Sequence, residues 1–288
     1  TSDANAIVIE AQNLFGPRSC EIHGIKTFNG AKADDVILKT ASVIINTKSP
    51  LASVFDDVII GKQAILPEVD DIVYEDRLGT TGWIYRKKIL VGTRDLLIHH
   101  GVPVLKEDFE KKYTRKGRKV LYLAEAGKLM AMFVVSYSAD PQLKKALRKL
   151  EKSGMTILVR SADPFINDES IAELFELPDG YIRVMNSSNG RAFEKYSNLF
   201  AQKSPAYIVH NGSALGLVSA FSAAEDLQET RKLISVLISF GSALGLGVVG
   251  LLAFVGGIDQ LDAIKVALFQ AAWCIFVNLL AKIKSLFM

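Results

Sequence analysis

Long hydrophobic runs are concentrated at the end of the chain. The first extends from Leu233 to Val255 without a charge, and the second extends from Ala263 to Leu280 with Lys265 as its one charged residue. A helix of about 20 apolar residues crosses a bilayer core of about 30 Å. Both runs therefore predict membrane-spanning helices, joined by a turn at 256–260. The alternative is a helix buried in a large soluble core, and the four glycines of the first run argue against it because glycine weakens such a helix.

Basic residues flank this predicted hairpin. Arg231 and Lys232 precede the first run, Lys282 and Lys284 follow the second, and the turn between the runs is acidic. Because basic flanks stay on the cytoplasmic side, we expect residues 1–230 and the C-terminus to be cytoplasmic, in a multi-pass protein of the cell membrane. The N-terminus lacks an initiator methionine and a basic signal-peptide segment, which predicts a fragment of a longer chain.

Upstream of the hairpin, short apolar runs alternate with helical periodicity. Ala6–Ile9 and Met155–Val159 are continuous apolar runs typical of strands in a parallel sheet. The alternation predicts a doubly wound, Rossmann-like α/β domain that binds ligands at the carboxyl ends of its strands. Helical patterns at 34–59 and strand patterns at 72–137 interrupt this domain, and they predict an inserted α+β domain.

Composition narrows the classes of function and partner. The 288 residues include 34 basic and 31 acidic side chains, for a net charge of +3, and 49% of them are hydrophobic. The charge balance argues against nucleic acid as a partner, and the hydrophobic content excludes disorder. Cys20 and Cys274 are too far apart in sequence to suggest a disulfide framework or a zinc motif. The partners that we expect are membrane lipid, upstream membrane helices of the same protein and an unidentified protein.

One tract is strongly basic. Residues 111–119 read Lys-Lys-Tyr-Thr-Arg-Lys-Gly-Arg-Lys. Runs of like charge are typical of solvated loops, and an exposed loop is what we expect here. A contact with phosphate or lipid is the alternative.

Three segments in collinear order resemble the heavy-metal branch of the P-type ATPases. They are Ile89–Leu97, the helix start at Ala139–Pro141 and the apolar segment Ala271–Leu280. The resemblance extends over essentially the whole chain, from the phosphorylation strand of the family to its last two membrane helices. It implies a HAD-type P-domain at 1–33 and 134–229, an inserted domain similar to the nucleotide-binding domain at 34–133, and two membrane helices in 230–288.

The catalytic motifs of that family are not matched. Glu10 stands in the place of the phosphorylated Asp of D-K-T-G-T-L-T, Asp163 corresponds to the Asp of T-G-D, and Asn211 replaces the metal-binding Asp of G-D-G-x-N-D. Glutamate moves the nucleophile out by one methylene, and in-line attack tolerates a misplacement of about 1 Å poorly. A neutral amide is also a poorer Mg²⁺ ligand than a carboxylate. We therefore expect no phosphoenzyme, no catalytic residue and no bound metal.

The nucleotide-binding motifs are also incomplete. The His-Pro pair of the family appears as Ser49-Pro50, its G-x-G-x-x-G appears with Gly79 and Gly82 alone, and Gly92 matches the glycine of a strand-end motif. Glycines let a backbone approach a nucleotide closely. At these residues we expect weak ATP binding at most.

Three hypotheses about function follow. The first is a degenerate P-type ATPase-like membrane protein with a structural, regulatory or partner-binding role. The second is a divergent ATP-driven transporter of cations or heavy metals, which would use ATP and Mg²⁺. The third is a membrane-anchored HAD-like phosphohydrolase, which also needs an Asp nucleophile that the first strand does not supply. The first accounts best for the combined loss of the nucleophile, its neighbouring Lys and the metal-binding Asp.

Overall fold

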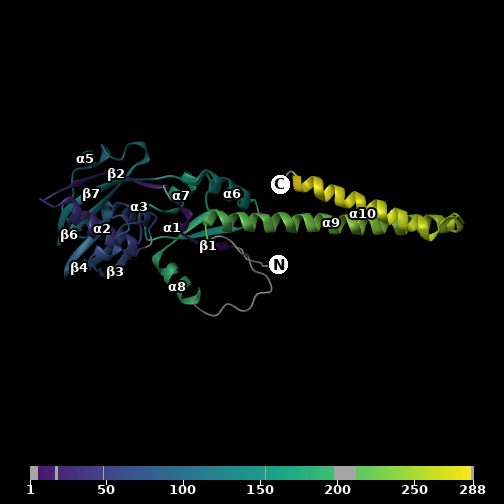
Figure 1. Cartoon of the computed structure of the whole chain (residues 1–288), viewed down its shortest axis with the longest axis horizontal. Coiled ribbons are helices and arrows are strands. Elements are labelled where there is room, and N and C mark those ends of the chain that lie inside the picture. The colour runs from purple at the N-terminus through teal and green to yellow at the C-terminus, as the bar shows by residue number, and fades with distance from the viewer. Residues whose placement is uncertain (1–5, 17–18, 48, 153, 198–211, 287–288) are drawn as a thin grey trace. The chain divides into compact units, whose positions relative to one another are not determined.

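The computed structural model describes residues 6–16, 19–47, 49–152, 154–197 and 212–286. The chain divides into two units, which we call unit 1 (Thr1–Ser219) and unit 2 (Ala220–Met288) (Figure 1). The strands that the structure describes all belong to unit 1, where they form two separate sheets. We describe the two units in turn.

The smaller sheet of unit 1 is parallel and has the order β1-β8-β9. Its strands are β1 (Ala6–Glu10), β8 (Thr156–Arg160) and β9 (Ile182–Met185), and the helices α1 (Ala11–Leu14), α6 (Pro141–Glu151), α7 (Asp168–Phe175) and α8 (Ser187–Ser197) accompany them. Ile9 and Val159 lie opposite each other and both are buried. The pairing of β1 with β8 is parallel, which confirms the parallel strands predicted from the two apolar runs.

The larger sheet is antiparallel and has the order β2-β7-β6-β5-β4-β3. In chain order its strands are β2 (Cys20–Thr27), β3 (Asp70–Glu75), β4 (Gly79–Ile84), β5 (Lys87–Gly92), β6 (Lys119–Glu125) and β7 (Lys128–Tyr137). The chain between them also forms α2 (Ala33–Asn46), α3 (Ala52–Val58), α4 (Arg94–His99) and α5 (Glu107–Lys111), with the short 3-10 turns η1 (Gln63–Ile65) and η2 (Arg115–Gly117).

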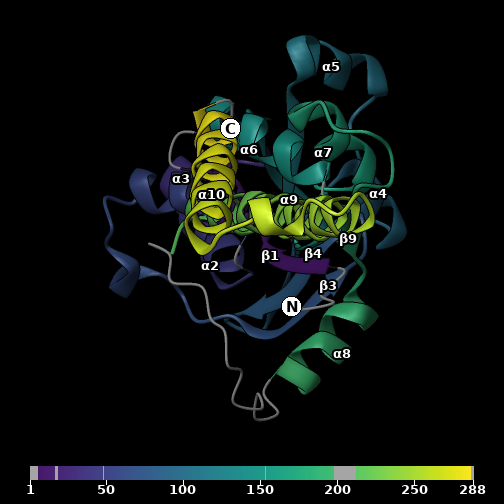
Figure 2. The same ribbon diagram turned by 90° about the vertical axis from the view of Figure 1, so that its right-hand side faces the viewer.

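Both faces of this larger sheet are covered. On one face Phe55 of α3 meets Phe133 of β7 edge to face, with the ring centroids 5.4 Å apart. On the other face Leu96 of α4 packs in a cluster with Tyr122 and Met132, and the aromatic ring of Phe109 from α5 packs against that cluster. Successive residues of β7 thus point to opposite faces of the sheet, as the pleat of a strand requires. Figure 2 shows α5 at the margin of unit 1.

The strands β2 and β7 pair across a long stretch of sequence. Cys20 lies opposite Tyr137 and Thr27 lies opposite Ala131, so residues 20–27 and 134–137, which lie outside the predicted insertion at 34–133, belong to the larger sheet. Periodicity within one strand could not show this pairing, because the partner of β2 lies more than 100 residues away in the sequence. The division into a P-domain-like part and an insertion stays a prediction.

Unit 2 contains most of α9 (Ala214–Phe254), the 3-10 turn η3 (Ile258–Gln260) and α10 (Ala263–Leu286). Both helices are long and apolar enough to span a membrane, with mean hydropathies of 2.2 and 1.8 over an 18-residue stretch of each. The first helix begins well before the predicted span at 233, since the polar residues that precede the span continue the same helix. The residues expected to form the turn, 256–260, separate the two helices.

The two helices of unit 2 meet at a glycine. A Cβ atom on Gly241 would lie 2.1 Å from Nε1 of Trp273, so any larger residue would push the indole away. The indole Nε1–H donates a hydrogen bond to the carbonyl oxygen of Leu237 at 3.0 Å. Gly245 faces the ring of Phe269 one turn further on. The small-xxx-small spacing of this helix thus permits the close helix contact that such spacing favours in membranes.

Candidate functional site

An ion pair lies at the carboxyl ends of the parallel strands. Glu10 and Arg160 are register partners at the ends of β1 and β8. A carboxylate oxygen of Glu10 accepts a hydrogen bond from Nη1 of Arg160 at 3.3 Å, and Nη2 of the same guanidinium donates to Glu194 of α8 at 3.2 Å. The side chains of Glu10 and Arg160 are 30% and 29% exposed. The residue in the nucleophile position therefore has a cation directly against its carboxylate.

Asp163, by contrast, is buried and is only 1% exposed. Its Oδ2 accepts hydrogen bonds from the hydroxyls of Ser49 at 2.7 Å and Tyr137 at 2.9 Å, and its Oδ1 accepts one from the backbone N–H of Phe165 at 3.0 Å. Burial raises the pKa of this carboxyl group, and the three hydrogen bonds only partly oppose that shift. Ionisation of Asp163 is therefore less favourable than it is in water.

The hydrogen bonds of Asp163 join the two sheets of unit 1. Ser49 follows α2 and Tyr137 ends β7, so both hydroxyls come from the larger sheet and the chain between its strands. Tyr74 of β3 donates from its hydroxyl to the backbone carbonyl of Asp163 at 3.5 Å, and burial raises the pKa of Tyr74 to about 12. Burial and then the neighbouring Asp163 also raise the pKa of the Cys20 thiol. We call Asp163, Ser49, Tyr137, Tyr74 and Cys20 the Asp163 cluster.

The residues predicted to bind nucleotide are all buried. Ser49 is 1% exposed, and its hydroxyl donates to Asp163 while it accepts from the backbone N–H of Leu51 at 3.1 Å. Pro50 beside it is buried as well. The sequence motifs did not predict that Ser49 contacts Asp163, which is 114 residues away. Nucleotide binding at these residues stays a prediction.

Close strand packing explains the three glycines of that predicted site. Gly79 and Gly92 are partners across β4 and β5. A Cβ atom on Gly92 would lie 2.3 Å from the carbonyl oxygen of Leu78, and one on Gly79 would lie 2.4 Å from that of Val91. A Cβ atom on Gly82 would lie 2.7 Å from Cγ1 of Val69. The fold needs glycine at these positions whether or not a nucleotide binds.

Replacing Gly92 by alanine is therefore expected to destabilise unit 1 by about 1–3 kcal/mol, because the new methyl group would overlap backbone atoms that cannot move aside. The matched control is Gly24→Ala in β2, where a Cβ atom would meet nothing within 4 Å. For that change we expect a loss within about 0.5 kcal/mol. Urea unfolding of the detergent-solubilised protein measures both. Equal losses would show that strand packing does not explain Gly92.

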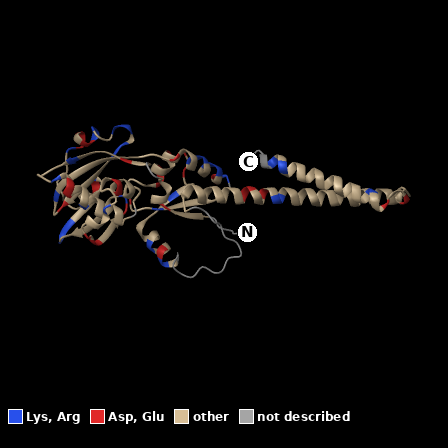
Figure 3. Ribbon diagram, viewed as in Figure 1, with Lys and Arg blue, Asp and Glu red and all other residues tan. Residues whose placement is uncertain are grey.

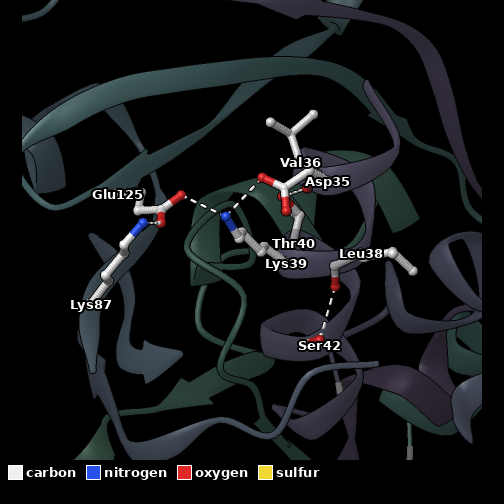
Figure 4. A network of polar contacts seen from close by, with 8 residues as sticks. All are labelled: Asp35, Val36, Leu38, Lys39, Thr40, Ser42, Lys87 and Glu125. Carbon is white, nitrogen blue, oxygen red and sulfur yellow. Dashed lines mark hydrogen bonds and ion pairs between the residues drawn. The ribbon is translucent and has the colours of Figure 1, made fainter. Parts of the chain in front are cut away.

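A buried ion-pair network lies elsewhere in the insertion, where sequence patterns indicated nothing (Figure 4). Nζ of Lys39 in α2 lies 2.7 Å from Oε2 of Glu125 and 2.7 Å from Oδ2 of Asp35, and Nζ of Lys87 lies 3.0 Å from Oε1 of Glu125. Burial alone would lower the pKa of Lys39 and raise that of Glu125. The hydrogen bonds outweigh burial, so the pKa of Lys39 is raised and that of Glu125 is lowered.

Glu125 flanks the hairpin turn that joins β6 to β7 and pairs with Lys128 across it. It is the last residue of β6, and Lys128 is the first residue of β7. The turn consists of Ala126 and Gly127, both with positive φ, of 48° and 78°. Two-residue hairpin turns with positive φ at both positions match the twist of the flanking strands. This places the Glu125 side chain on the sheet, where Lys39 can reach it.

The described carboxylates of the candidate site do not fit Mg²⁺. The cation of Arg160 lies against Glu10, and the carboxylate oxygens of buried Asp163 already accept hydrogen bonds from Ser49, Tyr137 and the backbone of Phe165. Mg²⁺ binds carboxylates that are ionised and open to its water ligands. Within the described residues, no three His, Cys, Asp or Glu side chains lie close enough together to hold a metal ion. Asn211, predicted in place of a metal-binding Asp, lies outside the described residues.

Comparison with known proteins gives one significant sequence match. The chain is 22% identical over 194 residues to Copper-transporting ATPase 2 of Rhizobium meliloti (strain 1021). The resemblance to heavy-metal P-type ATPases is confirmed. The match covers 67% of this chain and 24% of that ATPase, so the chain spans about a quarter of the length of its relative. No family model matches.

Solved structures resemble this chain with low TM-scores. A zinc-transporting PIB-type ATPase in the E2.Pi state has a TM-score of 0.42 and 11% identity, covering 96% of this chain and 49% of that chain. The catalytic domain of the CPx-ATPase CopB-B has a TM-score of 0.37 and 18% identity, covering 68% and 67%. The relationship to P-type ATPases rests on the sequence match. Together with the two apolar helices, that match indicates a membrane protein.

Proposed function

We propose that this chain is the cytoplasmic ATPase-like part and the following membrane hairpin of a P-type ATPase relative that no longer forms a phosphoenzyme. Its role is then structural, regulatory or partner-binding. Residues 1–230 and the C-terminus are cytoplasmic in this proposal, because basic residues flank the hairpin. Membrane lipid and upstream membrane helices surround the hairpin.

The ion pair between Glu10 and Arg160 is the observation that supports this proposal most strongly. A carboxylate that attacks phosphorus needs a free lone pair and a cation that neutralises the phosphate. Here the guanidinium engages the carboxylate itself, at 3.3 Å, and is held on its other side by Glu194. The positive charge of Arg160, which could help bind a phosphoryl group, is paired with two carboxylates of the protein instead.

The burial of Asp163 is consistent with the same proposal. Ser161–Asp163 stands in the place of the T-G-D motif. In the family, the carboxylate of that motif belongs to the catalytic centre. Here that side chain is enclosed by Ser49 and Tyr137, and it joins the larger sheet to the parallel sheet. Its chemistry is that of a structural hydrogen-bond acceptor.

A working transporter is the second candidate. The match to a copper-transporting ATPase favours it, because that match extends over 194 residues. Under this alternative the full-length protein would hydrolyse ATP with Mg²⁺, and Glu10 would have to leave Arg160 and act as the nucleophile.

An acylphosphate trap tests the two candidates. The full-length protein in detergent is incubated with γ-labelled ATP and Mg²⁺ and quenched in acid, with the Rhizobium ATPase as the positive control. We expect no acid-stable label on the wild-type protein or on Glu10→Gln, because no free carboxylate faces the phosphate. Label on the wild type that is absent from Glu10→Gln would establish the pump and contradict our proposal.

A further inference from the structure

The basic tract at 111–119 is folded against the larger sheet of unit 1. After α5 ends at Lys111, Lys116 and Gly117 adopt positive φ values of 61° and 75° and return the chain to β6. The ring of Tyr113 packs on that of Phe109, with the centroids 5.3 Å apart. The tract connects α5 to β6, contains the short turn η2 and has no buried residue, so the prediction of an exposed loop is confirmed.

This tract and the strands β2 and β7 line a cavity of about 280 Å³ that is open to solvent on one side. Lys26, Lys112 and Arg118 supply its positive charge. Buried Met132 and Val134 form an apolar floor, and Tyr113 adds an aromatic wall. None of the residues lining the cavity is among those predicted to bind nucleotide, so this is a different place on the insertion. Figure 3 shows acidic residues on α5 and basic residues in and after it.

The three cations of the cavity have no carboxylate partner in the part of the chain that the structure describes. Other nearby cations do, since Lys111 pairs with Asp108 at 3.6 Å and Arg94 pairs with Glu110 at 3.4 Å. Nζ of Lys26 lies instead over the ring of Phe109, 4.5 Å from its centroid. Like charges around one cavity repel each other, and a bound anion would relieve that repulsion.

We propose that this cavity binds a phosphate monoester carrying a small apolar or ring-shaped body. A phosphate matches the fork of donors on a guanidinium and the point charge of an ammonium group. The apolar floor and Tyr113 would hold the rest of the ligand, and the volume suits a body smaller than most drug-sized molecules. The phosphate comes either from a free metabolite or from a lipid headgroup.

Two binding measurements on the full chain in detergent or vesicles test this. Phenyl phosphate is titrated in solution and followed by ³¹P NMR, and cosedimentation compares vesicles containing phosphatidic acid with vesicles containing phosphatidylglycerol. The test variant is Lys112→Gln/Arg118→Gln, which removes two cations of the cavity. The matched control is Arg115→Gln/Lys119→Gln, which removes two cations of the same tract that do not line it.

We expect the wild type to bind at least one phosphomonoester probe with a Kd of about 1 mM or tighter. The test variant should weaken binding at least about tenfold and the control less than about twofold, since screened charges outside the cavity contribute little. Binding of phenyl phosphate identifies a soluble ligand, whereas binding only to phosphatidic acid vesicles identifies a headgroup. Equal losses in the two variants, or binding of neither probe, would overturn the proposal.

Discussion

The variant Lys39→Met is expected to lower the free energy of unfolding of unit 1 by about 3 kcal/mol, near the low end for breaking a buried ion pair. Lys39 and Glu125 are 8% and 7% exposed. Methionine keeps the apolar stem of the side chain but leaves the Glu125 carboxylate with Lys87 as its remaining partner. Removing one member of a buried pair is costly because the other charge stays out of water.

The exposed partner of the same carboxylate provides the control. The Lys87 side chain is 60% exposed, so Lys87→Met should cost less than about 1 kcal/mol. Urea unfolding at neutral pH measures both variants. Equal losses would contradict the view that burial determines the cost.

Acid should reduce the effect of Lys39→Met. The pKa of Glu125 is lowered in the folded protein, so its contribution to stability is present above the unfolded pKa of about 4.3 and is lost as pH falls through the folded value. The raised pKa of Lys39 gives a contribution to stability that is fully present below the unfolded pKa of about 10.4 and is lost only at alkaline pH, so it does not change across the acid range. The difference in the free energy of unfolding between the wild type and Lys39→Met should therefore become smaller below about pH 4.

The second large effect is expected at the Asp163 cluster. Asp163→Ala should destabilise unit 1 by about 3 kcal/mol, because it removes the acceptor from two buried hydroxyls at about 1–3 kcal/mol each, and relief of the buried charge offsets part of that loss. Asp163→Asn keeps the shape and one acceptor oxygen. It should therefore stay close to wild type at neutral pH.

The pH dependence of Asp163→Asn has a definite sign. Because the pKa of Asp163 is raised on folding, its contribution to stability is fully present below the unfolded pKa of about 3.9 and is lost as pH rises through the folded value. Asparagine does not titrate. The stability of Asp163→Asn relative to wild type should therefore increase with pH above about 4 in urea unfolding. A relative decrease would show that Asp163 is held as a carboxylate.

Local patterns were enough to predict most elements of this fold. The strands β1 and β8 follow from their apolar runs. The start of α6 follows from Asp140, whose carboxylate accepts hydrogen bonds from the backbone N–H groups of Gln142 and Leu143. The two apolar helices follow from the length of their hydrophobic runs. Each signal lies within one element and needs no knowledge of its neighbours.

The sequence suggested the residues of the candidate site, but it did not indicate which side chains would contact them. Glu10 was expected at a strand end, and it is there, yet nothing indicated that Arg160 would face it across 150 positions. Ser49 was predicted to bind nucleotide, and its motif did not indicate that its hydroxyl donates a hydrogen bond to Asp163. A motif compares a residue with its counterparts in a family and carries no information about which side chain lies against it.

The amino-acid sequence by itself determined most of the elements, their periodicity and the hydrophobic hairpin. Only the tertiary structure decided that β2 joins the larger sheet, that Lys39 pairs with Glu125 across 86 positions, and that the basic tract lines an open cavity. The physical reason is the range of the interactions. Helix and strand patterns arise between near neighbours, whereas ion pairs, buried hydrogen bonds and cavities require segments that meet only after folding.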